Sequence, residues 1–295
     1  MKLLIVINSL VLAGAEVLVS ELAPLLQESG IDVSILALQR LNSPLERTLN
    51  EKGMPLRFTR SGRIYSALQV RDLRQEFAKF DIVHTHLFPA QLWAALARRI
   101  RSASRRPILL TTEHNTDNNR RRWWLRPLDR FMYSRYDHII CNSGATLRAL
   151  EQWLPGLKVG MSVIPNGISL QRLTEAKPIA KHDLISPHHE ATPILISVAR
   201  FQPQKDHATL LRALANVQSA AHLVLVGDGQ LKSALESLAQ QLGIRERVHF
   251  LGRRADVPEL LKSADIFVHA THSDGFCLAA LEAMAAGLPD RKSVV

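Results

Sequence analysis

The sequence predicts an α/β protein built from two doubly wound parallel sheets. Short apolar segments alternate with longer segments of helical periodicity, and this alternation runs along both halves of the 295 residues. Strands that are apolar throughout are typical of parallel sheets covered by helices on both faces. The chain length and its 46% hydrophobic composition fit about two globular domains.

The N-terminal segment predicts a buried strand, Leu3–Ile7, followed by a helix from Ala15 to Glu28. An apolar N-terminus that ends in small residues could also be a secretory signal. Two observations favour the strand and helix instead: Asn8 and Ser9 interrupt the apolar run, and the apolar face of the helix continues well beyond them.

The remaining elements of the first half continue the same alternation. The predicted strands are Asp32–Leu38, a strand that begins at Asp81–His84, Ile108–Thr112, His138–Asn142 and Val159–Ile164. The predicted helices are Val70–Phe80, Pro89–Arg101 and a helix that ends at Trp153 and that Ser143 can cap. These elements define a first domain at residues 1–173.

Residues 174–192 lack periodicity and contain several prolines and histidines, which predicts an interdomain linker. The irregular spacing of these histidines favours solvated loop residues over metal ligands. The second domain is placed at residues 193–289. Its predicted elements, in order, are Ile194–Ala199, His207–Val217, Ala221–Val226, Leu231–Leu242, Val248–Leu251, Val257–Lys262, Ile266–His269 and Leu278–Ala286.

The formal net charge of +10 is concentrated in two basic clusters. The first contains Arg98, Arg99, Arg101, Arg105 and Arg106, and the second contains Arg120, Arg121, Arg122, Trp123, Trp124, Arg126 and Arg130. Such clusters suit phosphates, anionic lipid or nucleic acid, and they can also be ordinary solvated surfaces. For the second cluster, the paired tryptophans favour an anionic membrane surface, and no nucleic-acid partner is predicted.

Cysteine content and hydropathy indicate a cytoplasmic location. The two cysteines, Cys141 and Cys277, are too few for a disulfide framework. No apolar run approaches the ~18 residues that a membrane-spanning helix needs. The expected location is therefore cytoplasmic, with peripheral attachment at the inner face of the plasma membrane as an open possibility.

Basic residues follow the first strand of the second domain. Arg200 and Lys205 lie between that strand and the next helix, where they can bind the oxygens of a diphosphate. A departing diphosphate gains negative charge, which fixed cations stabilise. After the next strand, Gly227 begins a Gly-Asp-Gly turn, which can let the backbone approach a ligand or can be an ordinary turn.

The segment from Ser273 to Leu278 leads into the last predicted helix. A helix N-terminus offers backbone N–H groups to a phosphate. Asp274 precedes this helix and Glu282 lies within it, so the two acids can contact different parts of one ligand. Alternatively, they are a helix cap and an exposed acid.

The first domain places candidate residues at its own strand ends. Gly14 lies in the first strand-to-helix turn, and His86 and His114 follow two later strands. A single histidine is more often structural, but histidines that recur at strand carboxyl ends favour a functional site. The two domains are expected to face a cleft that contains both sets of residues.

The characteristic motifs of the chain are Val198-Ala-Arg-Phe-Gln-Pro-Gln-Lys, Leu225-Val-Gly-Asp-Gly, Val248-His-Phe-Leu-Gly, Asp274-Gly-Phe-Cys-Leu-Ala-Ala-Leu-Glu, Thr112-Glu-His-Asn and Val163-Ile-Pro-Asn-Gly-Ile, the last of which contains Asn166. Taken together, these motifs resemble glycosyltransferase family 4, the "group 1" family of retaining enzymes with the GT-B architecture of two Rossmann-like domains. The resemblance extends from Met1 to about Pro289.

The resemblance implies transfer of a sugar, with retention, from a nucleotide-sugar donor to a glycan or lipid-linked acceptor. UDP is the expected nucleotide, and no metal or other cofactor is expected. Arg200 and Lys205 would bind the diphosphate, Glu282 the ribose and Asp274 the sugar. His114 would be the active-site histidine, and the backbone N–H groups of Gly14, Leu278 and Ala279 would bind phosphate.

Two residues differ from the family pattern, and the resemblance implies that both lie close to the transferred sugar. Asp274 stands where Glu is usual, and Cys277 stands where Gly is common, so the resemblance does not specify the sugar. A non-hydrolysing sugar-nucleotide epimerase and a catalytically inactive nucleotide-sugar-binding protein are the alternative interpretations. The retained cations Arg200 and Lys205 argue against an inactive protein.

The family-like pattern stops at Pro289, which predicts that the second domain is incomplete by roughly 70–80 residues. Residues 290–295 can be encoded by a common sequencing-adapter sequence, so they are predicted to be non-native. The alternatives are a natural short C-terminus or a frameshift. The truncation is expected to leave a sheet edge unpaired, to lower stability and to remove activity.

Overall fold

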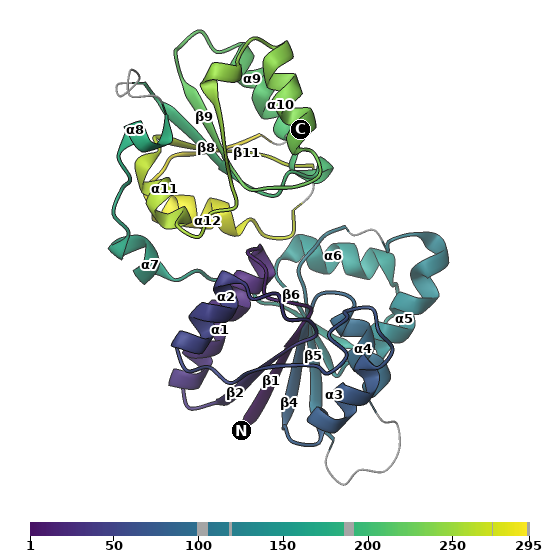
Figure 1. The fold of residues 1–295 in the computed structure, drawn as a ribbon. Coiled ribbons are helices and arrows are strands. Elements are labelled where there is room, and N and C mark those ends of the chain that lie inside the picture. Colours follow the sequence, from purple (N-terminus) through teal and green to yellow (C-terminus); the bar gives the residue numbers. More distant parts are fainter. Residues whose placement is uncertain (99–105, 118–119, 186–191, 273, 294–295) are drawn as a thin grey trace. The chain divides into compact units, whose positions relative to one another are not determined.

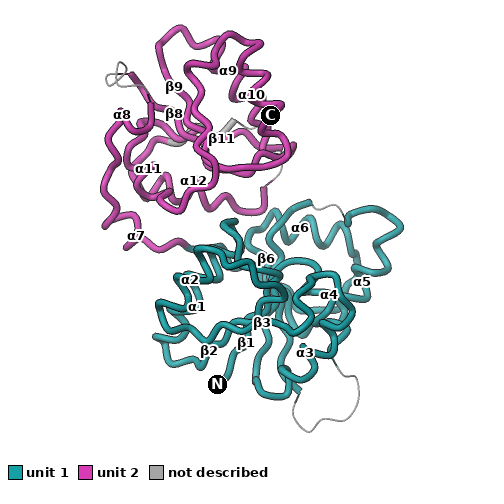
Figure 2. Tube along the Cα trace, viewed as in Figure 1, with its two compact units in different colours: residues 1–167 teal, residues 168–295 magenta. Residues whose placement is uncertain are grey.

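The computed structural model describes residues 1–98, 106–117, 120–185, 192–272 and 274–293. The chain forms two compact units, Met1–Gly167 and Ile168–Val295 (Figure 2). Each unit is a parallel sheet with helices on both faces, as the sequence predicts (Figure 1). Among the described residues, no helix combines the length and apolar character needed to cross a membrane.

Unit 1 contains a seven-stranded sheet in the order β3-β2-β1-β4-β5-β6-β7. All neighbouring strands pair in parallel. The strands are β1 (Lys2–Ile7), β2 (Asp32–Ala37), β3 (Leu56–Phe58), β4 (Ile82–His86), β5 (Ile108–Glu113), β6 (His138–Cys141) and β7 (Gly160–Val163). The strand order reverses between β1 and β4, and such a reversal creates a crevice at the carboxyl ends of the strands.

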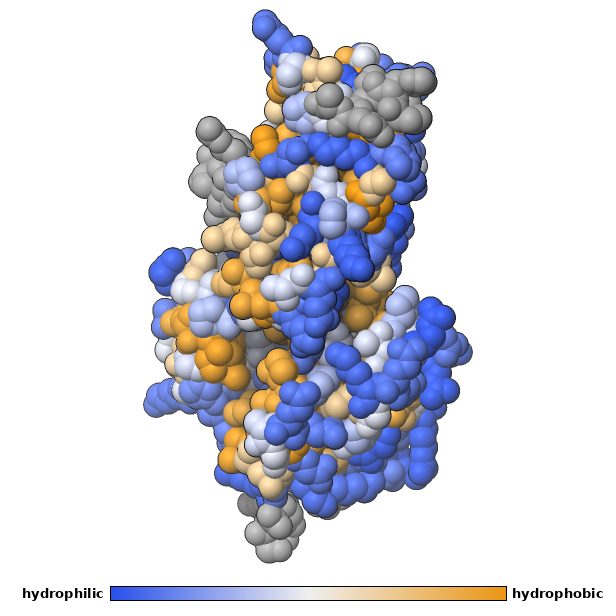
Figure 3. Space-filling view, turned by 90° about the vertical axis from the view of Figure 1, so that its left-hand side faces the viewer, coloured by the Kyte–Doolittle hydropathy of each residue, from blue (hydrophilic) through white to orange (hydrophobic). Residues whose placement is uncertain are grey.

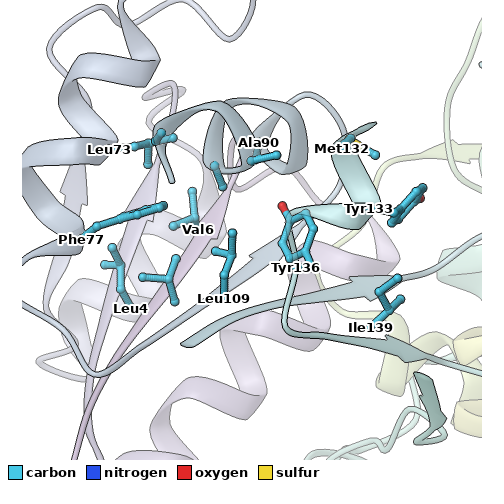
Figure 4. Packing of buried hydrophobic residues seen from close by; sticks show 14 of the residues in the cluster. Leu4, Val6, Leu73, Phe77, Ala90, Leu109, Met132, Tyr133, Tyr136 and Ile139 are labelled. Atoms are coloured by element: carbon cyan, nitrogen blue, oxygen red, sulfur yellow. The ribbon is translucent and has the colours of Figure 1, made fainter. Parts of the chain in front are cut away.

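Helices cover both faces of this sheet. They are α1 (Gly14–Glu28), α2 (Pro44–Glu51), α3 (Gln69–Phe77), α4 (Ala90–Ala97), α5 (Arg126–Ser134) and α6 (Gly144–Trp153). On one face, Val19 and Leu49 from α1 and α2 pack with Ile5 of β1. On the other face, Leu73 and Tyr133 belong to a second apolar cluster (Figure 4). Burying each such side chain contributes roughly 1.5–3 kcal/mol, so the two clusters hold the helices on the sheet.

Helices α2 and α5 and strand β3 were not predicted from the sequence. Helix α2 is short, and its N-terminus is fixed by local polar contacts: Ser43 Oγ accepts a hydrogen bond from the Glu46 backbone N–H at 3.2 Å. The Glu46 carboxylate in turn accepts from the backbone N–H of Leu41 and Asn42. Strand β3 has three residues, too few to show a period. The predicted cap at Ser143 is confirmed, because its hydroxyl accepts from the Thr146 backbone N–H at 3.1 Å.

Unit 2 contains a five-stranded parallel sheet in the order β10-β9-β8-β11-β12. Its strands are β8 (Ile194–Val198), β9 (His222–Val226), β10 (Val248–Gly252), β11 (Ile266–Ala270) and β12 (Asp290–Ser293). The order reverses between β8 and β11. One face is covered by α9 (His207–Ala215) and α10 (Lys232–Gln241), and the other by α11 (Val257–Ser263) and α12 (Leu278–Ala285).

The segment between the two sheets differs from the predicted linker. It contains the short helices α7 (Leu170–Glu175) and α8 (Lys181–Leu184), and residues 186–191 lie outside the described residues. Leu173, Leu184 and Ile185 are buried in the apolar cluster of unit 2. The boundary therefore falls at Gly167, earlier than the expected residue 173, because these apolar side chains anchor the segment to unit 2.

In the described part of the chain, the C-terminal residues form the edge strand of the sheet in unit 2, and the expected effect of a truncation stays a prediction. Strand β12 pairs in parallel with β11, in a register that aligns Asp290 with Phe267 and Ser293 with Ala270. This pairing uses backbone groups, which residues of almost any type can supply.

The surface mixes hydrophilic residues with smaller hydrophobic patches in the view of Figure 3. The most exposed large apolar side chain is Trp123, with 84% of its surface accessible, and Tyr65 follows with 71%. Isolated exposed apolar residues are normal, but large aromatic side chains at this level of exposure are candidates for contact with a partner.

Candidate functional site

In unit 2, the candidate residues gather beside the reversal of strand order between β8 and β11. Arg200 follows β8 and is exposed, and Lys205 ends a short 3-10 turn, Pro203–Lys205, just before α9. Asp274 lies in the loop between β11 and α12. Because β8 and β11 are neighbours in the sheet, their two loops lie at the same carboxyl edge.

An ion pair joins these two loops: the Lys205 ammonium group contacts the Asp274 carboxylate. Further bonds reinforce the junction. The Thr271 hydroxyl and the His272 backbone N–H both donate to the Gln204 carbonyl, each at 2.9 Å. The structure therefore brings together Lys205 and Asp274, which the sequence placed in one site from separate motifs.

His269, near the end of β11, extends this cluster and was not predicted as a site residue. Its Nε2 atom lies 3.5 Å from Asp274 Oδ2. Burial by itself lowers the pKa of His269, but Asp274 and Cys277 outweigh burial and raise it to about 9. Burial also opposes ionisation of Asp274, yet His269 and Lys205 lower its carboxyl pKa to about 2. Both groups are therefore charged at neutral pH.

The sequence did contain a signal for His269. The residue ends a predicted strand, and this is the criterion that selected His86 and His114 in the first half. Its position at a strand end therefore marks His269 in the sequence as it marks the two histidines of the first half.

Helix α12 begins directly after this charged cluster. Leu278 and Ala279 form its first turn, and Cys277 at the N-cap makes no side-chain hydrogen bond to the helix. The N–H groups of a first helical turn have no partner within the helix, and they carry the positive end of the helix dipole. Together with Lys205, this terminus can bind an anion. Glu282 lies about one turn further along α12 and is half-buried.

Gly227 permits a close contact within the protein. It has φ +147°, and a Cβ at this position would lie 2.0 Å from the carbonyl oxygen of Ala199. Gly229 has a similar role, since its Cβ would lie 2.4 Å from the carbonyl oxygen of Phe201. The turn is therefore packed closely against the loop that carries Arg200. The predicted approach of its backbone to a ligand stays a prediction.

In unit 1, a histidine cluster lies at the ends of β4 and β5. His86 Nδ1 is 3.0 Å from His114 Nε2, and His84 Nε2 is 2.7 Å from the hydroxyl of Thr112. His86 is almost fully buried, with 1% of its surface exposed. The predicted pair His86 and His114 is thus in direct contact, and His84 is a further member of the cluster.

Burial keeps these histidines neutral. It lowers the pKa of His84 and of His114 to about 4, and His114 adds a repulsive contribution at His84. Burial and the neighbouring rings hold the pKa of His86 well below its ordinary value. A neutral imidazole can donate through one nitrogen and accept through the other, so His114 can orient a hydroxyl group without carrying a charge.

Further polar contacts hold the loop after β5 and were not predicted. The Tyr133 hydroxyl donates to the Glu113 carboxylate, and burial raises the pKa of Tyr133 well above its ordinary value. The Asn142 side chain donates to the His114 carbonyl at 3.0 Å. The cluster therefore rests on a buried polar network that fixes the backbone around His114.

The remaining predicted residues of unit 1 are Gly14 and Asn166. Gly14 is exposed at the first position of α1, whose N-cap, Ala13, makes no side-chain hydrogen bond to the helix. Asn166 is half-buried in the segment after β7, at the end of unit 1.

The second basic cluster is less available than the sequence suggests. Arg120 forms an ion pair with the buried Asp129 at 3.2 Å, and Arg121 donates to the carbonyl oxygens of Thr116 and Ala149. Arg122, Trp123 and Trp124 remain exposed. Two of the expected surface charges thus stabilise unit 1 instead.

In the first basic cluster, Arg98 donates to the Arg135 carbonyl and pairs with Asp137 at 2.5 Å. Arg99, Arg101 and Arg105 lie outside the described residues. The described part of this cluster is therefore partly structural as well.

Comparison with known families gives matches over most of the chain. Residues 12–172 match the profile of Glycosyltransferase Family 4, and residues 180–289 match that of Glycosyl transferases group 1. The UDP-Gal:alpha-D-GlcNAc-diphosphoundecaprenol alpha-1,3-galactosyltransferase of Escherichia coli is 30% identical over 231 residues. The match covers 72% of this chain and 57% of that protein.

A second relative is the lipopolysaccharide core biosynthesis glycosyltransferase LpsD of Rhizobium meliloti, 31% identical over 53% of this chain and 43% of that protein. Among solved structures, Anabaena Alr3699/HepE in complex with UDP-glucose has a TM-score of 0.83 at 21% identity. That alignment covers 99% of this chain and 80% of the other, and at this identity it supports the fold alone.

Proposed function

Because the chain belongs to glycosyltransferase family 4, we propose that it transfers a sugar from a nucleotide-sugar donor to a glycan or lipid-linked acceptor. The chain spans between 57% and 61% of the length of three of the curated relatives that it matches. The activity is therefore proposed for the protein to which these residues belong.

The observation that carries the proposal is the Lys205–Asp274 pair beside the N-terminus of α12. It places a cation, a carboxylate and a helix N-terminus together at the strand edge of unit 2. Lys205 and Arg200 would stabilise the charge that grows on the departing diphosphate, with the backbone N–H groups of Leu278 and Ala279 as further donors. These groups offer the charge stabilisation that a metal ion supplies elsewhere, so we propose transfer without a metal cofactor.

The other proposed site residues would contact the sugar, the ribose and the acceptor. Asp274 would contact the transferred sugar and Glu282 the ribose. Neutral His114, held by His86, would orient a hydroxyl of the sugar or of the acceptor. We propose that the sugar keeps its anomeric configuration and that a donor phosphate oxygen accepts the proton of the acceptor hydroxyl. Gly14, at the first turn of α1, would bind phosphate through its N–H group.

UDP is the proposed nucleotide. The Anabaena protein, which shares the fold, is described in complex with UDP-glucose, and the Escherichia coli relative is named for a UDP-galactose donor. That relative is also named for a diphosphoundecaprenol acceptor, which supports a lipid-linked acceptor here. A peripheral location at the cytoplasmic face of a membrane would fit such an acceptor.

Nucleotide binding by the 295-residue chain tests the donor assignment directly. Isothermal titration calorimetry should show binding of UDP and UDP-glucose, and Arg200→Ala should weaken it about tenfold or more. The matched control is Arg212→Ala, which removes an exposed arginine from α9 in the same unit. Equal UDP affinity in the wild-type chain and Arg200→Ala would refute the role of Arg200.

Turnover is measured with radiolabelled UDP-sugars and a lipid-linked acceptor. Transfer of label to the acceptor supports the proposal. Conversion of the donor sugar without an acceptor would indicate an epimerase instead.

A further inference from the structure

We infer that His269, Asp274 and Cys277 form a binding site for a thiophilic divalent metal ion such as Zn²⁺, and that the metal opposes donor binding. The metal site is inferred from the geometry of unit 2 alone. The opposition to donor binding rests on the proposed donor site. The metal would be an inhibitor that competes with Lys205, and it would take no part in the transfer reaction.

The three side chains already converge. Each offers one ligand atom, an imidazole nitrogen, a carboxylate oxygen or a thiol sulfur, and these atoms all lie within 4.8 Å of one another. Bonds of about 2.0–2.3 Å at tetrahedral angles would place such atoms about 3.3–3.7 Å apart. The separation of 3.5 Å between His269 Nε2 and Asp274 Oδ2 matches this spacing without rearrangement. The whole set therefore needs only small side-chain movements to close around an ion.

His269 supplies an independent indication of a ligand. Only 5% of its surface is exposed, Nε2 has only the 3.5 Å ion-pair contact with Asp274, and within the described residues neither ring nitrogen makes a contact short enough to count as a hydrogen bond. An unsatisfied polar group costs free energy when it is buried. A metal ion would bind Nε2 in place of the proton that it carries beside Asp274, so that proton would be released to solvent and the metal would neutralise the carboxylate instead.

Cys277 determines which metal fits. It occupies the N-cap of α12 and offers its sulfur atom to the cluster. A ligand set of sulfur, nitrogen and carboxylate oxygen suits Zn²⁺ and is unsuited to Mg²⁺, which prefers oxygen alone. Cys141, the other cysteine of the sequence, is fully buried in β6 of unit 1, so it provides an internal control.

Lys205 connects this site to the donor. Its ammonium group contacts Asp274 Oδ2, the same oxygen that lies nearest to His269. A divalent ion bound to Asp274 would therefore displace Lys205 and would place a second positive charge beside it. The donor diphosphate would then bind less tightly, because Lys205 would no longer hold its position beside Asp274.

Cobalt provides the direct test, since Co²⁺ bound to a thiolate has a charge-transfer absorption that Co²⁺ bound by nitrogen and oxygen lacks. The wild-type chain and Cys141→Ser should show this absorption with one equivalent of Co²⁺, and Zn²⁺ should abolish it by displacement. Cys277→Ser should remove the absorption. His269→Gln should weaken Co²⁺ binding at least about tenfold, whereas His272→Gln, which changes an exposed histidine nearby, should leave it unchanged. Absorption that persists in Cys277→Ser, or no absorption in the wild-type chain, would overturn the site.

Lys205→Met separates the metal site from the donor site. Removing the competing ammonium group should tighten Co²⁺ binding by up to about fivefold, and should weaken UDP binding. Zn²⁺ should raise the apparent dissociation constant for UDP in the wild-type chain and in Cys141→Ser, but not in Cys277→Ser. If Co²⁺ binds through Cys277 and the chain does not bind UDP, the metal site is confirmed and the proposed function is refuted. If UDP binds and Zn²⁺ leaves its affinity unchanged, the competition is refuted.

Discussion

The Lys205 ammonium group and the Asp274 carboxylate form an ion pair that joins the loop after β8 to the loop after β11. The two residues flank the reversal of strand order in unit 2, where doubly wound sheets bind their ligands. A diphosphate that binds Lys205 must share its ammonium group with Asp274. In the proposed donor site, the pair would therefore couple donor affinity to the ionisation of Asp274, the residue proposed to contact the sugar.

This coupling predicts opposite effects for the two partners. Lys205→Met should weaken UDP binding about tenfold, because it removes a cation from the diphosphate. Asp274→Asn should leave UDP affinity unchanged or raise it up to about fivefold, because Lys205 loses its competing partner. Calorimetric titration of both variants measures these effects. Weaker UDP binding in Asp274→Asn than in Lys205→Met would contradict the assignment.

Adding a single methyl group at Gly227 should lower the free energy of unfolding strongly. Gly227→Ala would place a Cβ 2.0 Å from the Ala199 carbonyl oxygen, on a backbone with φ +147°. The expected loss in unfolding free energy is about 3 kcal/mol or more, from the clash and the backbone strain together. Gly243→Ala is the matched control, since Gly243 has φ +67° with nothing within 4 Å of its Cβ position. It should cost only about 1 kcal/mol.

Chemical denaturation gives both free energies, and hydrogen exchange in β8 and β9 reports whether the loss lies in unit 2. Equal stabilities of Gly227→Ala and Gly243→Ala would show that the loop relaxes away from the contact.

The sequence predicted most elements of the fold because buried parallel strands have a strong apolar signature. Strands such as β1 and β9 are buried at nearly every position, so their boundaries were predicted to within one or two residues. The failures have local causes. Helix α2 is short and is specified by the Ser43–Glu46 cap, and β3 is too short to show periodicity. In the segment expected to be a linker, Leu173 and Leu184 are apolar positions without a repeat, and only the tertiary structure shows that they are buried.

For the candidate site, the sequence identified residue types and loops but not the contacts between them. The positions of Arg200, Lys205 and Asp274 after predicted strands make them candidates, yet the Lys205–Asp274 pair depends on β8 and β11 being neighbours. Strand order is a tertiary property that local patterns do not contain. The local sequence of Gly227 is compatible with a ligand contact and with an ordinary turn, because it does not show that the Ala199 carbonyl lies beside this glycine.

Removing the hydroxyl group of Tyr133 should lower the stability of unit 1. Tyr133→Phe removes the donor to the buried Glu113 carboxylate and leaves that group less well paired. The expected cost is about 1.5–3 kcal/mol, the range for hydrogen bonds to charged groups. Tyr65→Phe, at a side chain with 71% exposure, should change stability by less than about 0.5 kcal/mol. Denaturant titrations compare the two variants, and equal costs would show that the Tyr133–Glu113 bond adds little.

The histidine cluster predicts that unit 1 loses stability in mild acid. The pKa values of His84 and His114 are lowered to about 4 in the folded chain, from an ordinary value of 6.5. Between these values the unfolded chain binds more protons, so stability is present above pH 6.5 and is lost as the pH falls towards 4. His114→Gln should reduce this loss by on the order of 1–3 kcal/mol.

The measurement is the denaturation midpoint at a series of pH values between 7 and 4, with hydrogen exchange to separate unit 1 from unit 2. His182→Gln, on α8 of unit 2, is the control for replacing an exposed histidine. An identical pH dependence in the wild-type chain and His114→Gln would contradict the burial of a neutral imidazole at this position.

The exposed segment Arg122, Trp123 and Trp124 predicts binding to anionic membranes. Trp123 and Trp124 expose 84% and 55% of their surfaces, and indole rings partition into the lipid headgroup region. Because Arg120 and Arg121 are engaged within unit 1, the tryptophans should contribute more to binding than charge does. Flotation with phosphatidylglycerol vesicles should recover the wild-type chain, and Trp123→Ala with Trp124→Ala should reduce recovery severalfold.

The control is Tyr65→Ala, which removes an exposed aromatic side chain elsewhere in unit 1 and should not reduce recovery. Moderate salt should weaken binding only partly, since complete release by salt would indicate that arginine charge, and not indole insertion, holds the chain on the vesicle.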